Sequence, residues 1–234
     1  TTLRSAIREV SATDIGRRLI DEAILERAGE AVQQGFRNEP GVTGRLEHTL
    51  AETYERLGMY DKAMNHAQRA LRIRRETLGP DAAESLRSQS VLGTILYRRG
   101  EFAAASKELE SAYDRQSAIL GRDHPDTLSS SLSRAWLMIE QDRLDEAKHL
   151  LEETIALQEK VLGPSHQSTI DSLNSLAVVF TNKELFDEAD TMHRRILAIR
   201  SEILGPAHPD TLKSKTNLAI VAFYKGHLDA AAEI

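Results

Sequence analysis

The feature that most constrains the fold of this chain is a dipeptide that returns at a fixed interval. Four copies of Leu-Gly stand in one register, and each lies 42 residues after the copy before it. These copies are Leu78-Gly79, Leu120-Gly121, Leu162-Gly163 and Leu204-Gly205. Self-similarity at a period of this length is typical of repeat proteins, in which each unit is one supersecondary element that stacks on its neighbours.

Three further columns of residues keep the same register. One column is alanine throughout: Ala63, Ala105, Ala147, Ala189 and Ala231. A second is aromatic or leucine: Tyr60, Phe102, Leu144, Phe186 and Leu228. A third is large and apolar, except in the last unit: Tyr54, Leu96, Met138, Phe180 and Ala222. Because two helices approach closely only where a side chain is small, the alanine column predicts a tightly packed position in every unit.

The apolar spacing within a unit is that of helices. Apolar residues recur at intervals of three and four, and in the fourth unit one stripe ends at Phe180 while a second begins at Phe186. A short polar turn over 182–184 separates the two stripes. Gly58, Gly100 and Gly226 occupy this turn in three other units, where a helix end favours a left-handed residue. Each unit is therefore predicted to be a helix-turn-helix hairpin.

The connectors between hairpins carry helix-start signals. Pro125 and Pro209 suit the first turn of a helix, where a missing N–H costs nothing. An aspartate follows each proline, at the positive end of the helix dipole. One histidine recurs in each of three connectors, and we interpret it as a helix cap. These histidines are His124, His166 and His208.

These residues resemble the tetratricopeptide repeat, in the 42-residue form found in kinesin light chains and related bacterial proteins. The likeness is clearest in the segments LGPAHPDTLKSKTNLAIVAFYKGHLDAA and LNSLAVVFTNKELFDEAD. It implies an all-α fold, a right-handed α-solenoid of helix-turn-helix repeats with an N-terminal capping helix. The expected units, after a cap over 1–35, are 36–77, 78–119, 120–161, 162–203 and 204–234, the last one truncated.

Three parts of the chain depart from the repeat pattern. Arg134 stands in a column that is otherwise leucine, so the third unit is expected to pack less tightly or to carry a specialised groove. Residues 1–35 lie outside the repeat, and their apolar stripe predicts one helix near 13–34 that covers the first unit. This stretch is also similar to the segment that precedes repeats in some bacterial serine/threonine kinases. At the C-terminus we expect the protein to continue past Ile234 and the last helix to fray or to pair with a neighbour.

Composition excludes several classes of protein. Hydrophobic residues make up 41% and charged residues 28%, which is typical of a folded chain. No apolar run reaches the roughly 20 residues that span a bilayer, and no signal-peptide core follows the N-terminus. The absence of cysteine excludes disulfides and thiolate chemistry. A formal net charge of -6 disfavours nucleic-acid binding.

No catalytic or cofactor motif is present, so we expect neither an enzyme nor a cofactor in this segment. The connector histidines would be about 8–10 Å apart on stacked helices, too far to share a metal ion. His48 and Glu52 stand one helical turn apart and could form half of a metal site, but no third ligand is evident. No metal site is predicted.

The resemblance implies that the first helix of each unit lines a concave groove. Two arginine pairs repeat there at the 42-residue step, Arg45 with Arg87 and Arg56 with Arg98, which predicts a basic N-terminal half and an acidic peptide ligand. Trp136 either anchors that ligand or packs between units. The predicted peptide-binding residues are Arg45, His48, Glu52, Arg56, Arg87, Thr94, Arg98, Trp136, Asn174, Asn182, Lys213, Asn217 and Tyr224. The pairs Arg74-Arg75 and Arg194-Arg195 are assigned no site.

The leading hypothesis for function is a scaffold or adaptor that holds a segment of a partner protein in this groove. One alternative is a regulatory module of a larger enzyme, such as a kinase. Another is a structural spacer that self-associates weakly through its open ends. We expect no nucleic-acid partner and no membrane insertion, and the cytoplasm is the expected compartment.

Overall fold

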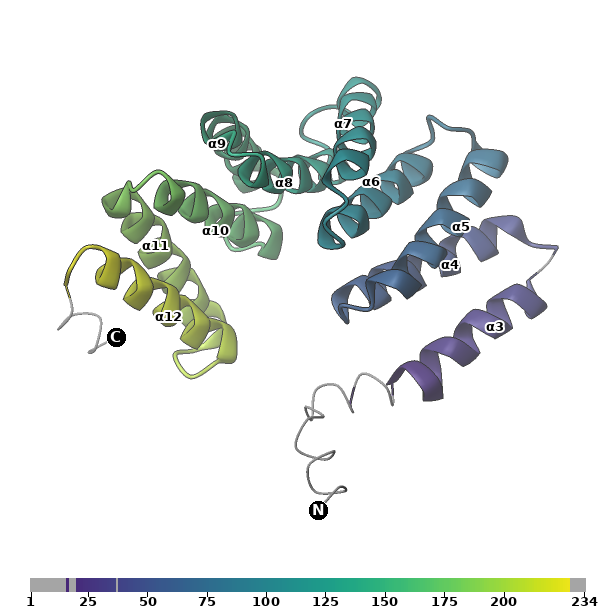
Figure 1. The fold of residues 1–234 in the computed structure, drawn as a ribbon, viewed down its shortest axis with the longest axis horizontal. Helices are drawn as coiled ribbons and strands as arrows, with labels where there is room; N and C mark the ends of the chain where they lie inside the picture. The colour runs from purple at the N-terminus through teal and green to yellow at the C-terminus, as the bar shows by residue number, and fades with distance from the viewer. Residues whose placement is uncertain (1–15, 17–19, 37, 228–234) are drawn as a thin grey trace, which may run out of the picture. The chain divides into compact units, whose positions relative to one another are not determined.

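The computed structural model describes residues 16, 20–36 and 38–227, and this part of the chain consists of helices joined by turns, without a strand (Figure 1). None of the helices it describes has the length and apolar character needed to cross a membrane. The predicted all-α class is confirmed. Of the helix predicted near 13–34, residues 13–15 and 17–19 lie outside the described residues, as do Leu228, Ala231 and Ile234 at the other end.

The chain divides into two compact units, Thr1–Glu108 and Leu109–Ile234, and the division falls within one helix. The described helices are η1 (Asp21–Leu25, a π-helical turn), α3 (Glu26–Gly35), α4 (Pro40–Arg56), α5 (Tyr60–Leu78), α6 (Ala83–Arg98), α7 (Phe102–Ile119), α8 (Pro125–Glu140), α9 (Leu144–Val161), α10 (Gln167–Asn182), α11 (Phe186–Leu204) and α12 (Pro209–Tyr224). The first unit runs from η1 into α7, and the second from α7 to α12.

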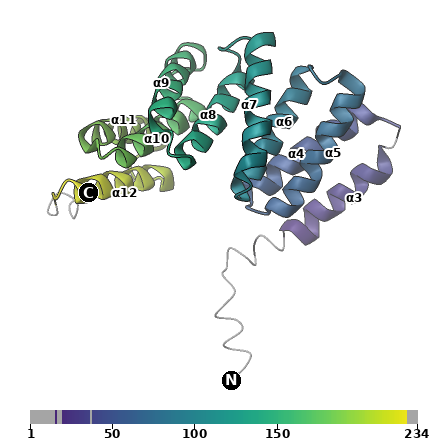
Figure 2. The same cartoon turned by 45° about the horizontal axis from the view of Figure 1, so that its top comes forward.

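Within each unit, consecutive helices pack against one another. In the first, α4 packs on α5 and α5 on α6. In the second, α8 packs on α9, α9 on α10, α10 on α11 and α11 on α12 (Figure 2). The first helices of neighbouring hairpins also meet, α4 with α6 and α8 with α10. This is the packing that the hairpin prediction requires.

A residue with positive φ turns the chain inside every hairpin. Gly58, Gly100 and Gly226 have φ of 74°, 78° and 77°, which confirms the role predicted for them. The same position is Asp142 in the third hairpin and Glu184 in the fourth, with φ of 57° and 58°. These two side chains therefore adopt a conformation that favours glycine.

The alanine column marks closed positions in the packing, as predicted. Four members, Ala63, Ala105, Ala147 and Ala189, have no exposed surface. The large apolar column is buried as well: Tyr54, Leu96, Met138, Phe180 and, in the last unit, Ala222. Because protein interiors of this density have no room for added atoms, a larger residue in the alanine column would overpack the contact between helices. The free energy of unfolding would fall by about 1–3 kcal/mol.

The connector histidines cap the helices that follow them. The Nδ1 atom of each accepts the backbone N–H two residues ahead, at 3.2 Å for His124, His166 and His208. Pro125 and Pro209 occupy the first turns of α8 and α12. The predicted capping role is confirmed.

Arg134 has an aromatic partner in the structure. Its guanidinium carbon lies 4.8 Å from the ring centroid of Tyr113, which is a cation–π geometry. Tyr113 stands where other units have Leu71, Ile155 and Leu197. The leucine-to-arginine departure is therefore matched by an aliphatic-to-tyrosine change on the facing helix.

Polar contacts join η1 and α3 to the first hairpin. The hydroxyl of Tyr54 donates to Asp21 at 2.8 Å, and Lys62 pairs with both Asp21 and Glu26. Tyr54 and Asp21 are buried. Burial and the Asp21 hydrogen bond raise the pKa of Tyr54 well above its usual range, so its hydroxyl stays a donor.

Acid–base pairs also recur at the hairpin turns, each between residues 38 positions apart. The pairs are Asp61 with Arg99, Asp145 with Lys183 and Asp187 with Lys225. Each aspartate is largely exposed, so water screens each pair and the pair contributes little to stability.

Candidate functional site

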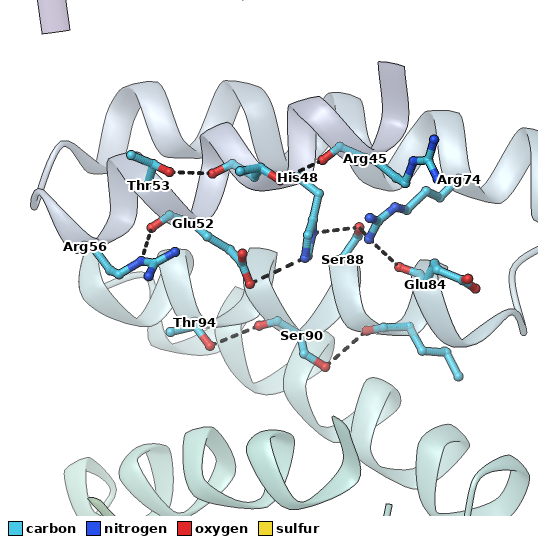
Figure 3. A network of polar contacts seen from close by, with 12 residues as sticks. Arg45, His48, Glu52, Thr53, Arg56, Arg74, Glu84, Ser88, Ser90 and Thr94 are labelled. Atoms are coloured by element: carbon cyan, nitrogen blue, oxygen red, sulfur yellow. Dashed lines mark hydrogen bonds and ion pairs between the residues drawn. The ribbon is translucent and has the colours of Figure 1, made fainter. Parts of the chain in front are cut away.

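The arginines that the sequence singles out lie on two neighbouring first helices of the first unit. Arg45 and Arg56 are on α4, while Arg87 and Arg98 are on α6. All four are exposed. We call these four residues the arginine surface. Arg45 and Arg56 stand toward opposite ends of α4, with His48 and Glu52 between them (Figure 3).

A chain of polar contacts connects α4, α5 and α6 beneath this surface. The Nη1 atom of Arg74 donates to the Ser88 hydroxyl at 2.8 Å and to the Glu84 carbonyl at 2.9 Å. Ser88 Oγ lies 3.2 Å from Nδ1 of His48. The other ring nitrogen of His48 faces Glu52 at 3.5 Å (Figure 3). We call Arg74, Ser88, His48 and Glu52 the polar chain.

The donor and acceptor groups of its members determine the direction of the hydrogen bonds in the polar chain. A guanidinium only donates, so Ser88 accepts from Arg74 and its own hydrogen points to Nδ1 of His48. A neutral His48 then carries its proton on Nε2, which faces the Glu52 carboxylate. Every member therefore has a partner suited to it, which holds Glu52 in place at the surface.

The charges around the polar chain perturb two of its groups. The hydrogen bond from His48, followed by the positive charges of Arg56 and Arg87, holds the pKa of Glu52 below its usual value. Partial burial opposes this shift without reversing it. Glu52 is therefore a carboxylate at neutral pH.

The surroundings of Arg74 disfavour its charged form. Burial lowers its pKa first, and the positive charge of Arg87 lowers it further. The charge of Arg45 acts in the same direction, while Glu84 and Glu52 oppose it. The guanidinium of Arg74 is thus repelled by those of Arg87 and Arg45, and an anion bound near it would offset that repulsion.

Ser88, His48 and Glu52 are connected in the same order as the residues of a nucleophilic triad, but the environment of Ser88 is unsuited to nucleophilic attack. Ser88 has no exposed surface, and its oxygen already accepts from Arg74. A nucleophile needs an oxygen that substrate can reach and lone pairs that are free to attack. The arrangement therefore positions side chains rather than providing a nucleophile.

The structure separates the predicted residues of the first unit by their exposure. His48 is 6% exposed, so the structure places it beneath the surface rather than on it. Glu52 and Thr94 are half-buried. Arg98 lies 3.5 Å from the Glu55 carboxylate, and Arg56 donates to the Glu52 carbonyl at 3.3 Å.

A cavity of about 340 Å³ adjoins the Arg45 end of the arginine surface. Its charged lining consists of Arg45, Arg74, Glu39 and Glu84, and Val42 and Leu78 contribute an apolar part. Leu78 is exposed. This end therefore offers both a cationic and an apolar contact to a bound segment.

In the second unit, the predicted residues have more local roles. Trp136 is half-buried and packs against the core cluster that includes Leu173 and Phe180, which favours the packing role among its two predicted alternatives. The Asn174 amide donates to the Ile170 carbonyl at 3.1 Å. Tyr224 stacks on Phe186 with ring centroids 5.7 Å apart. Asn182 and Lys213 are exposed, and Asn217 is half-buried.

Sequence reasoning missed Arg74, the buried end of the polar chain. The signal that could have revealed it is Arg200, which stands three repeats later and donates in the same way to Ser214 at 2.9 Å and to the Asp210 carbonyl at 3.2 Å. Serine fills the partner position in four of the five units: Ser88, Ser130, Ser172 and Ser214. The arginine position is Gln116 and Gln158 in the two middle units, both without exposed surface.

Among the residues that the structure describes, no group of three or more histidine, aspartate or glutamate side chains is placed to hold a metal ion. His48 and Glu52, the half-site considered from sequence, face each other as a pair.

Comparison with known proteins places this geometry in context. The crystal structure of BtubC (BKLC) from P. vanneervenii is 21% identical, with a TM-score of 0.75 over 96% of this chain and 88% of the other. A putative kinesin light chain from Podosopora anserina, with TPR-like repeats, is 28% identical, with a TM-score of 0.67 over 81% of this chain and 90% of the other. Apo RapI is 15% identical, with a TM-score of 0.68 over 93% of this chain and 59% of the other.

The family comparison covers most of the sequence. No match was found among the curated proteins. The model of the tetratricopeptide repeat matches residues 42–118, 91–160 and 168–234. These segments carry the columns that the structure buries and the turns that it closes with positive φ. The chain therefore belongs to the tetratricopeptide repeat family, with kinesin light chain-like proteins among its structural neighbours.

Proposed function

We propose that this protein is an interaction scaffold that binds an acidic segment of a partner protein on the arginine surface of α4 and α6. The observation that carries this proposal is the exposure of Arg45, Arg56, Arg87 and Arg98 on two adjacent first helices, at a 42-residue step. The repeat fold supports the broader function of a protein-interaction scaffold.

Guanidinium groups suit this task because their planar donors bind carboxylates in a bidentate manner. The repulsion that Arg87 and Arg45 exert on Arg74, which Glu84 and Glu52 oppose, favours an anionic ligand further, since repulsion between like charges costs free energy. The polar chain holds its members beneath the surface, so little side-chain ordering is left for binding to supply there.

Affinity capture with a charge-reversed variant tests the proposal. We would compare the wild-type chain with Arg45→Glu/Arg87→Glu in capture from a lysate of the source organism, and identify captured proteins by mass spectrometry. A matched control is Arg72→Glu/Lys107→Glu, which makes the same change in charge at exposed residues of the second helices α5 and α7. Circular dichroism establishes that all three are equally helical.

We expect a partner that the wild type and the control capture and that Arg45→Glu/Arg87→Glu loses. The retained partner should carry an acidic segment whose synthetic peptide competes for binding. Equal capture by all three proteins would contradict the proposal and would place binding on another face.

A further inference from the structure

We infer that the arginine surface recognises two acidic groups about five residues apart in an extended segment, with a non-acidic residue between them. This inference rests on the proposed function and specifies the pattern of charge that the partner must carry.

The spacing follows from helix geometry. Arg45 and Arg56 are separated by 11 residues, which is close to three helical turns, so they share one face of α4 about 16 Å apart. Arg87 and Arg98 have the same separation on the adjacent α6. The two helices therefore present two arginine pairs at the same distance. An extended chain rises about 3.3 Å per residue, so about five residues cover that distance.

Glu52 sets the requirement for the middle of the segment. It lies seven residues after Arg45, about two turns, and therefore on the same face of α4. Its depressed pKa keeps it ionised at neutral pH, and the polar chain fixes its position. An acidic residue opposite Glu52 would meet a like charge, whereas an uncharged donor would meet an acceptor.

The two ends of the surface differ in strength. At the Arg45 end, the charge of Arg74 adds to those of Arg45 and Arg87 against the opposing charge of Glu84. The cavity beside Val42 and Leu78 offers an apolar contact at the same end. At the other end, Arg98 shares its charge with Glu55, and exposed pairs of this kind are screened by water. The Arg45 end should therefore dominate the affinity.

Three fluorescein-labelled peptides with blocked termini would test this pattern by anisotropy. The first, Glu-Glu-Ser-Thr-Ser-Glu-Glu, has acidic doublets whose centres lie five residues apart. The second, Ser-Glu-Glu-Glu-Glu-Thr-Ser, has the same composition with contiguous acids. The third, Glu-Glu-Ser-Glu-Ser-Glu-Glu, carries an additional negative charge opposite Glu52.

We expect the spaced peptide to bind at least roughly threefold more tightly than the contiguous one. This ratio corresponds to the free energy of about one exposed ion pair. The third peptide should bind more weakly than the first despite its greater charge, whereas attraction to a diffuse positive field would make it bind more tightly. Equal affinity for the first two peptides, or tighter binding of the third, would overturn the inference.

Single variants locate each end of the peptide. Arg45→Gln should weaken the spaced peptide more than Arg98→Gln, and Arg72→Gln on α5 should leave its affinity unchanged. Glu52→Gln should remove the penalty of the third peptide relative to the first, so that the two peptides no longer bind in the order that the wild type shows. A third peptide that remains penalised in Glu52→Gln would show that Glu52 does not set the pattern.

Failure of this inference is distinguishable from failure of the proposed function. If contiguous and spaced peptides bind equally well and both lose affinity in Arg45→Glu/Arg87→Glu, the surface binds acidic segments without reading their spacing. If no peptide binds and the captured partner ignores that double variant, the proposed function itself is wrong.

Discussion

Arg74 shows how a single buried side chain supports the surface above it. Only 6% of its surface is exposed, and its guanidinium donates to Ser88 and to the Glu84 carbonyl. Through Ser88 it orients His48, and through His48 the carboxylate of Glu52. A change at Arg74 should therefore affect both stability and the surface, although Arg74 itself is hardly accessible to a ligand.

We predict that Arg74→Met lowers the free energy of unfolding by about 1–3 kcal/mol, because buried acceptors lose their donor. Urea unfolding followed by circular dichroism measures the difference. Arg72→Met, an exposed position on the same helix, should change stability by less than about 0.5 kcal/mol. Similar losses in both variants would show that the hydrogen bonds of Arg74 contribute little.

His193 makes the stability of the protein depend on pH. Burial lowers the pKa of His193 below the 6.5 of a free histidine, and the nearby charge of Asp190 opposes that effect only in part. The unfolded chain therefore binds a proton here more readily than the folded one. Stability contributed by neutral His193 is present above about pH 6.5 and is lost as the pH falls below it.

We predict that His193→Leu reduces the loss of stability between about pH 7.5 and about pH 5.5. Leucine is the residue at this register in two other units, Leu109 and Leu151, both without exposed surface. Unfolding in denaturant at the two pH values measures the change. A pH dependence in His193→Leu as steep as that of the wild type would contradict the assignment.

At the scale of elements, the turn that follows the first helix of a unit does not always carry the residue best suited to its conformation. Glycine adopts the positive φ at Gly58, Gly100 and Gly226, while Asp142 and Glu184 adopt it at a conformational cost. Glutamate gains no local hydrogen bond of the kind that aspartate makes in this conformation, so the fourth hairpin is the more strained of the two.

We predict that Glu184→Gly raises the free energy of unfolding by about 0.5–1 kcal/mol, because it removes that strain. The reverse change at the same register, Gly100→Ala, should lower it by about 1 kcal/mol or more, although an added Cβ would meet no atom within 4 Å. Thermal unfolding compares both with the wild type. A less stable Glu184→Gly would mean that the glutamate side chain makes a contribution larger than the strain.

The elements were predictable from the sequence because packing and turn chemistry repeat at every unit. The alanine column, the turn glycines and the histidine caps each recur often enough for their physical role to be read without coordinates. The polar chain could not be read in the same way, since its residue types change from unit to unit. His48 and Arg74 illustrate the difficulty, because burial of a polar residue depends on a partner from another helix.

At the scale of the whole molecule, two compact units carry different surfaces. The first combines exposed arginines with a polar chain that links α4, α5 and α6 beneath them. In the second, Trp136 packs on the core and Asn174 bonds its own helix, so these predicted residues serve the hairpins. We therefore assign the acidic ligand to the first unit.

The most direct test of this account is a charge swap between protein and peptide. Anisotropy would compare the wild type and Arg45→Glu/Arg87→Glu, each with the spaced peptide Glu-Glu-Ser-Thr-Ser-Glu-Glu and with its counterpart in which lysine replaces every glutamate. We predict that the wild type binds only the glutamate peptide and that the double variant binds only the lysine peptide. A double variant that still binds the glutamate peptide as the wild type does would contradict the assignment of the ligand to Arg45 and Arg87.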